Sequence, residues 1–273
     1  SQIGLLIKTR PDALDWEVVS LLKELGAVGV FLGVENASPS GLRALGRGSK
    51  QDKINEALEL LKGNLSVTFN LLIFHPRATL QEINENIYFM KDHLDLAFDF
   101  GRAEIVAGSP LEKMVQRKNL LRGQWPHWDY RIVDDAMEKM FRINALTFYK
   151  EDSPYPALSH MLIALSYRSQ LLNRFYPGKK SQKFQRETEN LILTSNEFTL
   201  KNLLEIYHMV AYGEDEIDLL YHQMEAFYAF LTNKASDLSG RMARFQLVEK
   251  KFKKRGVDNY LQNSKTMERI FRI

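Results

Sequence analysis

The first 107 residues alternate between short apolar runs and stretches of helical periodicity, and this alternation limits the fold more than any other feature. Short apolar runs are typical of buried strands, whereas the helical stretches place apolar residues on one face. Strands that alternate with helices pair in parallel through right-handed crossovers. The predicted strands are Ile3 to Thr9, Val28 to Val34, Ser66 to Phe74 and Arg102 to Ala107, and the predicted helices are Leu14 to Leu25, Pro39 to Leu45, Lys50 to Lys62 and Leu80 to His93.

Residues at the ends of the predicted helices support these boundaries. Asp15 comes directly before Trp16-Glu17-Val18 and Gly26 follows Leu25, as expected of an amino-terminal cap and a carboxyl-terminal stop. Ser38 precedes Pro39, and a serine cap followed by proline at the first helical position is typical of a helix start.

Four parallel strands are too few to close a parallel barrel, which needs about eight. The predicted fold class is therefore α/β, a partial (half) parallel β/α barrel of about four strands followed by an all-helical domain. We expect an exposed sheet edge near Ile3 to Thr9, because nothing in the sequence supplies the missing strands. The chain starts with Ser1 and Gln2 rather than Met, which predicts that the natural protein begins further upstream.

The second half of the sequence has no convincing strand pattern. Acidic residues and two prolines interrupt helical periodicity between Lys150 and Pro156, so we place a domain boundary there, with domains 1–152 and 153–273. The predicted helices after it are Ala157 to Phe175, Ser181 to Leu193, Thr199 to Tyr212, Glu214 to Leu231, Ser236 to Lys254, and a last one toward Arg272.

Composition excludes several classes of function. The net charge of +3 is far below that expected of a dedicated nucleic-acid binder, so nucleic-acid binding is not expected. No apolar run is long enough to span a membrane and no signal peptide is present, so we expect a cytoplasmic protein without a membrane partner. The sequence has no cysteine, and the single pair Glu205 and His208 is too little for a di-iron bundle, so we assign no metal ligands.

Candidate binding residues follow from the expected sheet, because ligands of parallel α/β proteins meet the carboxyl ends of the strands. Arg10 follows the first strand and could bind a carboxylate or phosphate. The second strand ends in Glu35 and Asn36, and a carboxylate there could accept hydrogen bonds from a sugar hydroxyl or an amine. His75 follows the third strand. By the alternation of strand residues, Arg102 and Glu104 share a face of the fourth.

Each of these residues also has an ordinary structural interpretation. Arg10 could form a surface salt bridge, Glu35 could cap the following helix, and His75 before Pro76 could be a turn residue. Their position at one edge of one sheet favours function, since loops at that edge commonly carry it.

Several blocks, in this order and spacing, resemble the later strands of radical S-adenosylmethionine enzymes. These blocks are Lys8-Thr9-Arg10-Pro11-Asp12, Gly33-Val34-Glu35-Asn36, Arg47-Gly48-Ser49 and Phe74-His75-Pro76 followed by Thr79-Leu80-Gln81-Glu82-Ile83. The next blocks, Arg102-Ala103-Glu104-Ile105, Gly108-Ser109-Pro110-Leu111, Leu121-Arg122-Gly123 and Tyr130-Arg131-Ile132-Val133-Asp134, look like the cobalamin-binding class of that superfamily. The resemblance covers about residues 3 to 150.

The resemblance implies cofactors and site residues. In the family, the Glu of the Gly-x-Glu segment meets S-adenosylmethionine, which maps onto Glu35, and by analogy Arg10 and His75 face the same cavity. Asn36, Arg102 and Glu104 complete the implied cofactor-binding set, and no catalytic residue is assigned. The family's Cys-x-x-x-Cys-x-x-Cys loop, which holds a four-iron four-sulfur cluster, has no counterpart here, and the cobalamin domain would also lie upstream. The usual Gly-Phe-Pro reads Phe74-His75-Pro76, a bulkier replacement for the glycine.

These features lead to a first hypothesis and an alternative. The first is a carboxyl-terminal fragment of a cobalamin-dependent radical S-adenosylmethionine enzyme, of the methyltransferase or cyclase type, that contributes cofactor and substrate contacts. Its partners would be the missing amino-terminal half and a small-molecule or peptide substrate, and the chain alone would be inactive. The alternative is a non-catalytic binding or interaction module on a degenerate α/β scaffold. A complete hydrolase is disfavoured because no nucleophile and base pair is found.

Overall fold

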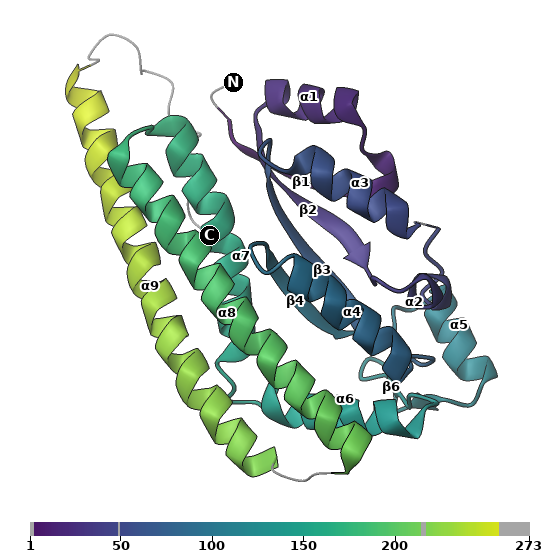
Figure 1. The fold of residues 1–273 in the computed structure, drawn as a ribbon. Coiled ribbons are helices and arrows are strands. Elements are labelled where there is room, and N and C mark those ends of the chain that lie inside the picture. The colour runs from purple at the N-terminus through teal and green to yellow at the C-terminus, as the bar shows by residue number, and fades with distance from the viewer. Residues whose placement is uncertain (1–2, 49, 214–216, 257–273) are drawn as a thin grey trace.

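The computed structural model describes residues 3–48, 50–213 and 217–256 (Figure 1). Its first part alternates strands and helices, and its last part is helical. In chain order the elements are β1 (Leu5–Thr9), η1 (Pro11–Ala13), α1 (Trp16–Leu25), β2 (Ala27–Glu35), α2 (Pro39–Ala44), α3 (Gln51–Leu61), β3 (Ser66–Phe74), α4 (Leu80–Asp92), β4 (Ala97–Arg102), α5 (Pro110–Arg117), β5 (Leu121–Arg122), β6 (Asp129–Tyr130), α6 (Asp135–Thr147), α7 (Tyr155–Phe175), α8 (Lys179–Tyr212) and α9 (Ile217–Gly256).

The main sheet has four strands in the order β1-β2-β3-β4, and all neighbours are parallel. Helices α1, α3 and α4 lie on one side of it, and α7, α8 and α9 lie on the other (Figure 1). The strand residues whose side chains point toward α1, α3 and α4 are buried, and Val30, Leu32 and Phe69 are fully so. The predicted fold class, a partial α/β barrel followed by a helical domain, is confirmed.

Local sequence signals explain where the first helices begin and end. The Asp15 carboxylate accepts a hydrogen bond from Val18 N at 2.8 Å, and Gly26 ends α1 in the left-handed conformation with φ of 105°. Ser38 caps α2, accepting from Gly41 N, with Pro39 at the first helical position. These cap predictions are therefore confirmed.

The fourth strand lies where the sequence did not predict it. β4 spans Ala97–Arg102, so the predicted strand Arg102 to Ala107 is wrong apart from its first residue. A tight turn, with Leu96 N donating to His93 O at 3.1 Å, brings the chain from α4 into β4 within a few residues. The alternating polar and apolar residues after Arg102 imitate a strand but form an irregular segment.

The helical part consists of fewer and longer helices than predicted. α8 runs unbroken through Leu193 to Thr199, where two helices were predicted, and α9 likewise runs unbroken through the predicted gap before Ser236. The polar run in α8 that predicted a break lies inside the helix, and its Asn196 faces the turn between α4 and β4. Asn196 is buried there and its amide donates to Leu94 O at 2.9 Å and Leu96 O at 2.7 Å. The helix predicted toward Arg272 lies outside the described residues.

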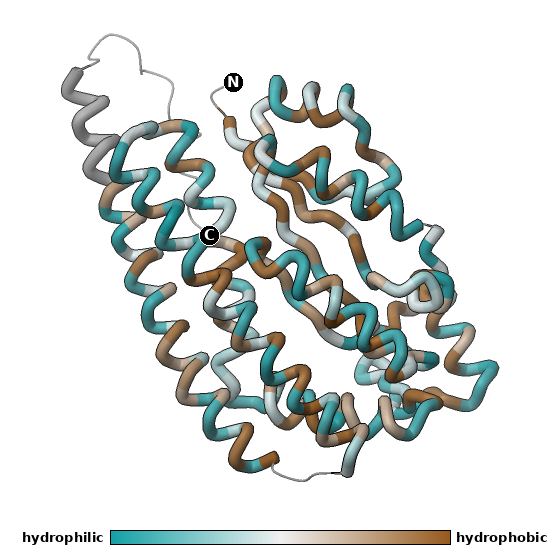
Figure 2. The backbone as a smooth tube through the Cα atoms, in the orientation of Figure 1, coloured by the Kyte–Doolittle hydropathy of each residue, from teal (hydrophilic) through white to brown (hydrophobic). Residues whose placement is uncertain are grey.

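α7 packs directly on the concave face of the sheet, the face away from α1, α3 and α4. Ser166 Oγ lies 2.7 Å from Ser66 Oγ of β3, and the Tyr167 hydroxyl contacts Thr68. Gly29 of β2 has no room for a side chain because the Tyr167 ring occupies that place. Figure 2 shows the apolar strands between the helices. The helices alternate between hydrophilic and hydrophobic residues along their length.

β1 is an edge strand, as expected, because β2 is its sole partner within the described sheet. The edge is also apolar and exposed: Leu6 is 53% exposed, and on the neighbouring α1 Trp16, Leu21 and Leu25 are exposed as well. None of the helices in the described part of the chain is long and apolar enough to cross a membrane.

Candidate functional site

Glu35 stands at the carboxyl end of β2 in an uncommon backbone conformation. Its φ is 63°, and Asn36 N donates to Val34 O at 2.7 Å across it. A hydrogen bond from residue i+2 to residue i around a positive φ defines the rarer and more strained form of the γ-turn. The Glu35 side chain is mostly buried, and its Oε1 lies 3.1 Å from Arg47 Nη2. The turn therefore holds a carboxylate at this edge with one arginine partner.

Arg10 lies near this carboxylate but has its own partner. Its guanidinium binds Asp12 in a bidentate manner, with Nε donating at 2.8 Å and Nη2 at 2.7 Å. The hydrogen bond and charge of Asp12 raise the pKa of Arg10. Arg10 Nη2 lies 4.0 Å from the place that a Cβ on Gly48 would take, next to Arg47. The structure thus brings Arg10, Glu35 and Arg47 to one end of the sheet.

Asn36 lies in a buried polar network instead of facing a cavity. Its Oδ1 accepts from Ser38 N at 2.8 Å and from Asn86 Nδ2 at 3.1 Å, and its Nδ2 donates to Leu72 O at 3.3 Å. Asn86 Oδ1 in turn accepts from Ala37 N at 2.9 Å. The network fastens the turn after Glu35 to α4, which gives Asn36 a structural role, and a cofactor contact by it stays a prediction.

His75 belongs to the same buried layer. Its Nε2 lies 3.1 Å from Glu82 Oε2, and both side chains are buried. Burial by itself raises the pKa of Glu82, but contacts with His75 and Ser40 outweigh it, so that the net shift is downward. Because His75 is 1% exposed, a direct cofactor contact by it also stays a prediction.

Arg102 is held by a small hairpin of β5 and β6. Its guanidinium lies over the rings of Tyr130 and Phe141, at 3.8 Å and 4.2 Å from their centroids, and Nη2 lies 2.8 Å from Asp129 Oδ1. Nη2 also donates to the Tyr130 carbonyl. Glu104 is exposed and lies beyond the end of β4, so the strand alternation that placed it beside Arg102 does not apply. Arg102 docks the hairpin, and cofactor binding by either residue stays a prediction.

Two parts of this edge were not assigned a role from the sequence. Arg47 is separated from Glu35 by α2, and only the folded chain brings the two together. Glu82 and Asn86 are the other part. They are polar residues on the apolar side of α4, beside Ile83 and Ile87, and a polar pair in such a stripe is a signal that could have been used.

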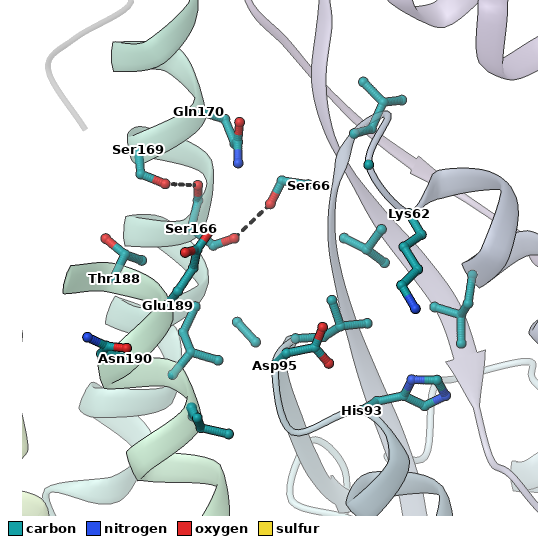
Figure 3. A pocket seen from close by; sticks show the side chains of 18 of the residues that line it. Lys62, Ser66, His93, Asp95, Ser166, Ser169, Gln170, Thr188, Glu189 and Asn190 are labelled. Atoms are coloured by element: carbon teal, nitrogen blue, oxygen red, sulfur yellow. Dashed lines mark hydrogen bonds between the residues drawn. The ribbon is translucent and has the colours of Figure 1, made fainter. Parts of the chain in front are cut away.

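A cavity lies at the opposite end of the sheet, near the amino ends of β3 and β4 (Figure 3). It measures about 450 Å³ and lies between the sheet and helices α7 and α8. Hydroxyl and amide groups line its helical wall and charged side chains its rim, among them Lys62, Asp95 and Glu189. None of the predicted site residues lines it.

The residues present do not fit an iron-sulfur cluster. Such clusters are held by cysteine thiolates, and the sequence contains no cysteine. Among the described residues, no three His, Asp or Glu side chains are grouped so as to hold a metal ion. A carboxylate such as Glu35, by contrast, fits the hydroxyl groups of a nucleoside, which are hydrogen-bond donors.

Comparisons with known proteins give matches in structure alone. No protein-family model matches the chain, and no curated protein matches it. Among solved structures, the chain is similar to the cobalamin-dependent S-adenosylmethionine radical enzyme OxsB, with 14% identity and a TM-score of 0.46 over 85% of this chain and 47% of that one.

Two further solved structures are similar over parts of the chain. The radical S-adenosylmethionine methyltransferase TsrM from Kitasatospora setae matches with 14% identity and a TM-score of 0.41, over 86% of this chain and 45% of that one. Elp3 from the archaeon Methanocaldococcus infernus matches with 20% identity and a TM-score of 0.41, over 54% of this chain and 33% of that one. The chain therefore spans less than half the length of each of these solved chains.

Proposed function

We propose that this chain is the carboxyl-terminal part of a cobalamin-dependent radical S-adenosylmethionine enzyme of the methyltransferase or cyclase type. The chain contributes contacts to S-adenosylmethionine and to the substrate. The iron-sulfur loop and the cobalamin site belong to other parts of the protein, so the chain alone does not start radical chemistry. When bound beside a reduced cluster, S-adenosylmethionine supplies the radical.

The observation that carries the proposal is the strained turn at Glu35. Backbone strain of this kind is kept where the surroundings hold it and is concentrated at functional sites. The turn lies in the Gly33-Val34-Glu35-Asn36 block on which the family resemblance rests. Arg47 contacts Oε1 of Glu35, and the carboxylate keeps further capacity to accept hydrogen bonds from ribose hydroxyls. The buried hydrogen bond between Asn36 and Asn86 links the turn to α4 and stabilises it.

The edge formed by β1 and α1 supports the proposed partner, the amino-terminal half of the same protein. In the part of the chain that the structure describes, β1 pairs with β2 alone, and its other edge is open to a further parallel strand. The exposed Trp16, Leu21 and Leu25 of α1 lie next to it, where the helix of a preceding β/α unit would pack. In a longer barrel, the strand of the preceding β/α unit would pair with the open edge of β1 and its helix would pack on the apolar face of α1.

Calorimetry with S-adenosylhomocysteine tests the proposed contact. We expect the chain to bind this compound weakly, because the cluster that normally holds the amino-acid end is absent. Glu35→Ala should weaken binding about ten-fold or more, as expected for the loss of hydrogen bonds to a charged group. Glu24→Ala, which removes the same charge from an exposed position of α1, is the matched control and should leave binding unchanged.

The outcomes separate the two hypotheses. Equal binding by the Glu35 and Glu24 variants would show that Glu35 does not contact the ligand. If the unaltered chain does not bind S-adenosylhomocysteine at all, the proposal fails and the non-catalytic binding module becomes the better account.

A further inference from the structure

Asn70 of β3 and Asp99 of β4 are neighbours on the concave face of the sheet, and the proposed function gives neither of them a role. They are register partners in the parallel pair, so their side chains leave the same face of strands about 5 Å apart. Thr68, two residues before Asn70, contacts Tyr167 of α7 on this face, which identifies it as the concave one. Both Asn70 and Asp99 are partly exposed, and residues of α7 face Asp99 across this side of the sheet.

The two side chains present hydrogen-bond acceptors that lack adequate donors. Asn70 Oδ1 is buried and has no hydrogen-bond partner among the described residues. Asp99 Oδ1 accepts from Phe100 N at 2.9 Å and lies 3.3 Å from the Tyr149 hydroxyl. That hydroxyl has one proton, and the Phe100 carbonyl is its nearer acceptor. A buried acceptor without a donor is costly unless a ligand or water completes it.

Asp99 also lacks a cationic partner. Among the described residues, no lysine, arginine or histidine lies within ion-pair distance of its carboxylate, whereas other half-buried acids, such as Glu35 and Glu138, have arginine partners. The titratable groups that face Asp99 are Tyr149, which follows α6, and Tyr155 and His160 of α7. Burial raises the pKa of Asp99, so its ionised form is costly without a counter-charge.

Beside the pair, β4 itself leaves room for a further group. Gly101 follows on the same face of β4, and a Cβ added there would lie 3.7 Å from the Tyr149 hydroxyl and would meet nothing closer. No side chain of β4 therefore blocks a small polar group at this position.

We propose that Asn70 and Asp99 bind a cationic group with several N–H donors, an alkylammonium or guanidinium, on a small molecule or peptide. Such a group supplies the missing counter-charge to Asp99 and the missing donor to Asn70 Oδ1. As a substrate contact this site rests on the proposed function, since the substrate would then carry an amine or guanidine. Its test uses no S-adenosyl compound, so each proposal can fail without the other.

Agmatine, which carries both a guanidinium and an ammonium group, is the probe. In amide nitrogen–hydrogen correlation spectra of the full chain, we expect saturable shifts confined to the signals of β3, β4 and the facing part of α7. Asp99→Asn keeps the shape but removes the charge, and should weaken agmatine binding about ten-fold or more. Asp95→Asn, an exposed carboxylate at the other end of β4, is the matched control and should bind like the unaltered chain.

A second variant keeps the test decisive if Asp99→Asn does not fold. Asn70→Asp adds a second carboxylate beside the first, and it should strengthen agmatine binding if this pair is the cation site. The proposal is overturned if both variants bind like the unaltered chain, or if the agmatine shifts map to the cavity around Asp95 and Glu189 instead of β3 and β4.

Discussion

Glu35 is a residue whose backbone conformation suits glycine better than glutamate. Its φ of 63° places the Cβ close to the following carbonyl, which costs about 1 kcal/mol or more for a residue other than glycine. The sequence could place Glu35 at a strand end, because the apolar run of β2 stops there. It could not predict the turn, because neither the positive φ nor the Arg47 contact follows from local residue preferences.

Replacing Glu35 tests this strain. Glu35→Gly and Glu35→Ala both lose the carboxylate and its Arg47 contact, but only the glycine variant relieves the backbone. We expect Glu35→Gly to be more stable than Glu35→Ala by about 1 kcal/mol, measured as the free energy of unfolding in urea. An alanine variant at least as stable as the glycine variant would show that the turn is unstrained.

Asp99 is a residue whose charge should reduce stability. Burial raises the pKa of its carboxyl above the ordinary value of 3.8, so the unfolded chain loses this proton at lower pH than the folded chain. Stability from this group is therefore fully present below pH 3.8 and is lost as the pH rises through the folded-state pKa.

The variant Asp99→Asn removes this dependence. Its free energy of unfolding should approach that of the unaltered chain in acid and exceed it at neutral pH, measured by urea unfolding at several pH values. Asp95→Asn should show no such gain, since Asp95 is exposed. A gain for Asp99→Asn that is the same at every pH would indicate altered packing and not a proton equilibrium.

At the scale of elements, strand and helix types were predictable where local signals agree with tertiary packing. Ser66 to Phe74 is predicted and observed with the same bounds. Its apolar residues alternate along the strand and are buried on the face that α1, α3 and α4 cover. β4 was misplaced because Asp99, which lies on the concave face beside Asn70, interrupts its apolar pattern. α8 was divided because serine and asparagine are common in turns, yet here Ser195 and Asn196 are buried within the helix.

Asn196 joins α8 to the turn between α4 and β4. Its amide donates to two carbonyl oxygens, of Leu94 and Leu96, which lose this donor in Asn196→Ala. We expect that variant to lose about 2 kcal/mol of unfolding free energy, because buried acceptors are left unpaired. Asn190→Ala, at an exposed position of the same helix, is the control for helix propensity and should change stability little. Equal losses in both variants would contradict the docking role.

At the scale of the whole molecule, α7 connects the sheet and the helical part. The division into 1–152 and 153–273 rests on a change of sequence pattern, and it stays a prediction. The side-chain contacts of α7 belong to both parts, since Ser166 and Tyr167 contact β3 while the same helix packs against α8 and α9. A helix shared in this way predicts that sheet and bundle unfold as one cooperative unit, in spite of the change of pattern.

Native-state hydrogen exchange measures this coupling. The slowest amides of β2 and β3 should open with the same free energy as the slowest amides of α7 and α8, because opening either part exposes the α7 interface. Gly29→Ala drives a methyl group into the Tyr167 ring, and it should lower both opening free energies together by about 1 to 3 kcal/mol. Gly33→Ala, whose added methyl would have its nearest neighbour at 3.4 Å, should lower them less. Were the bundle to keep its protection while β2 and β3 lost theirs, the two parts would be independent domains, and α7 would rest on the sheet without stabilising it.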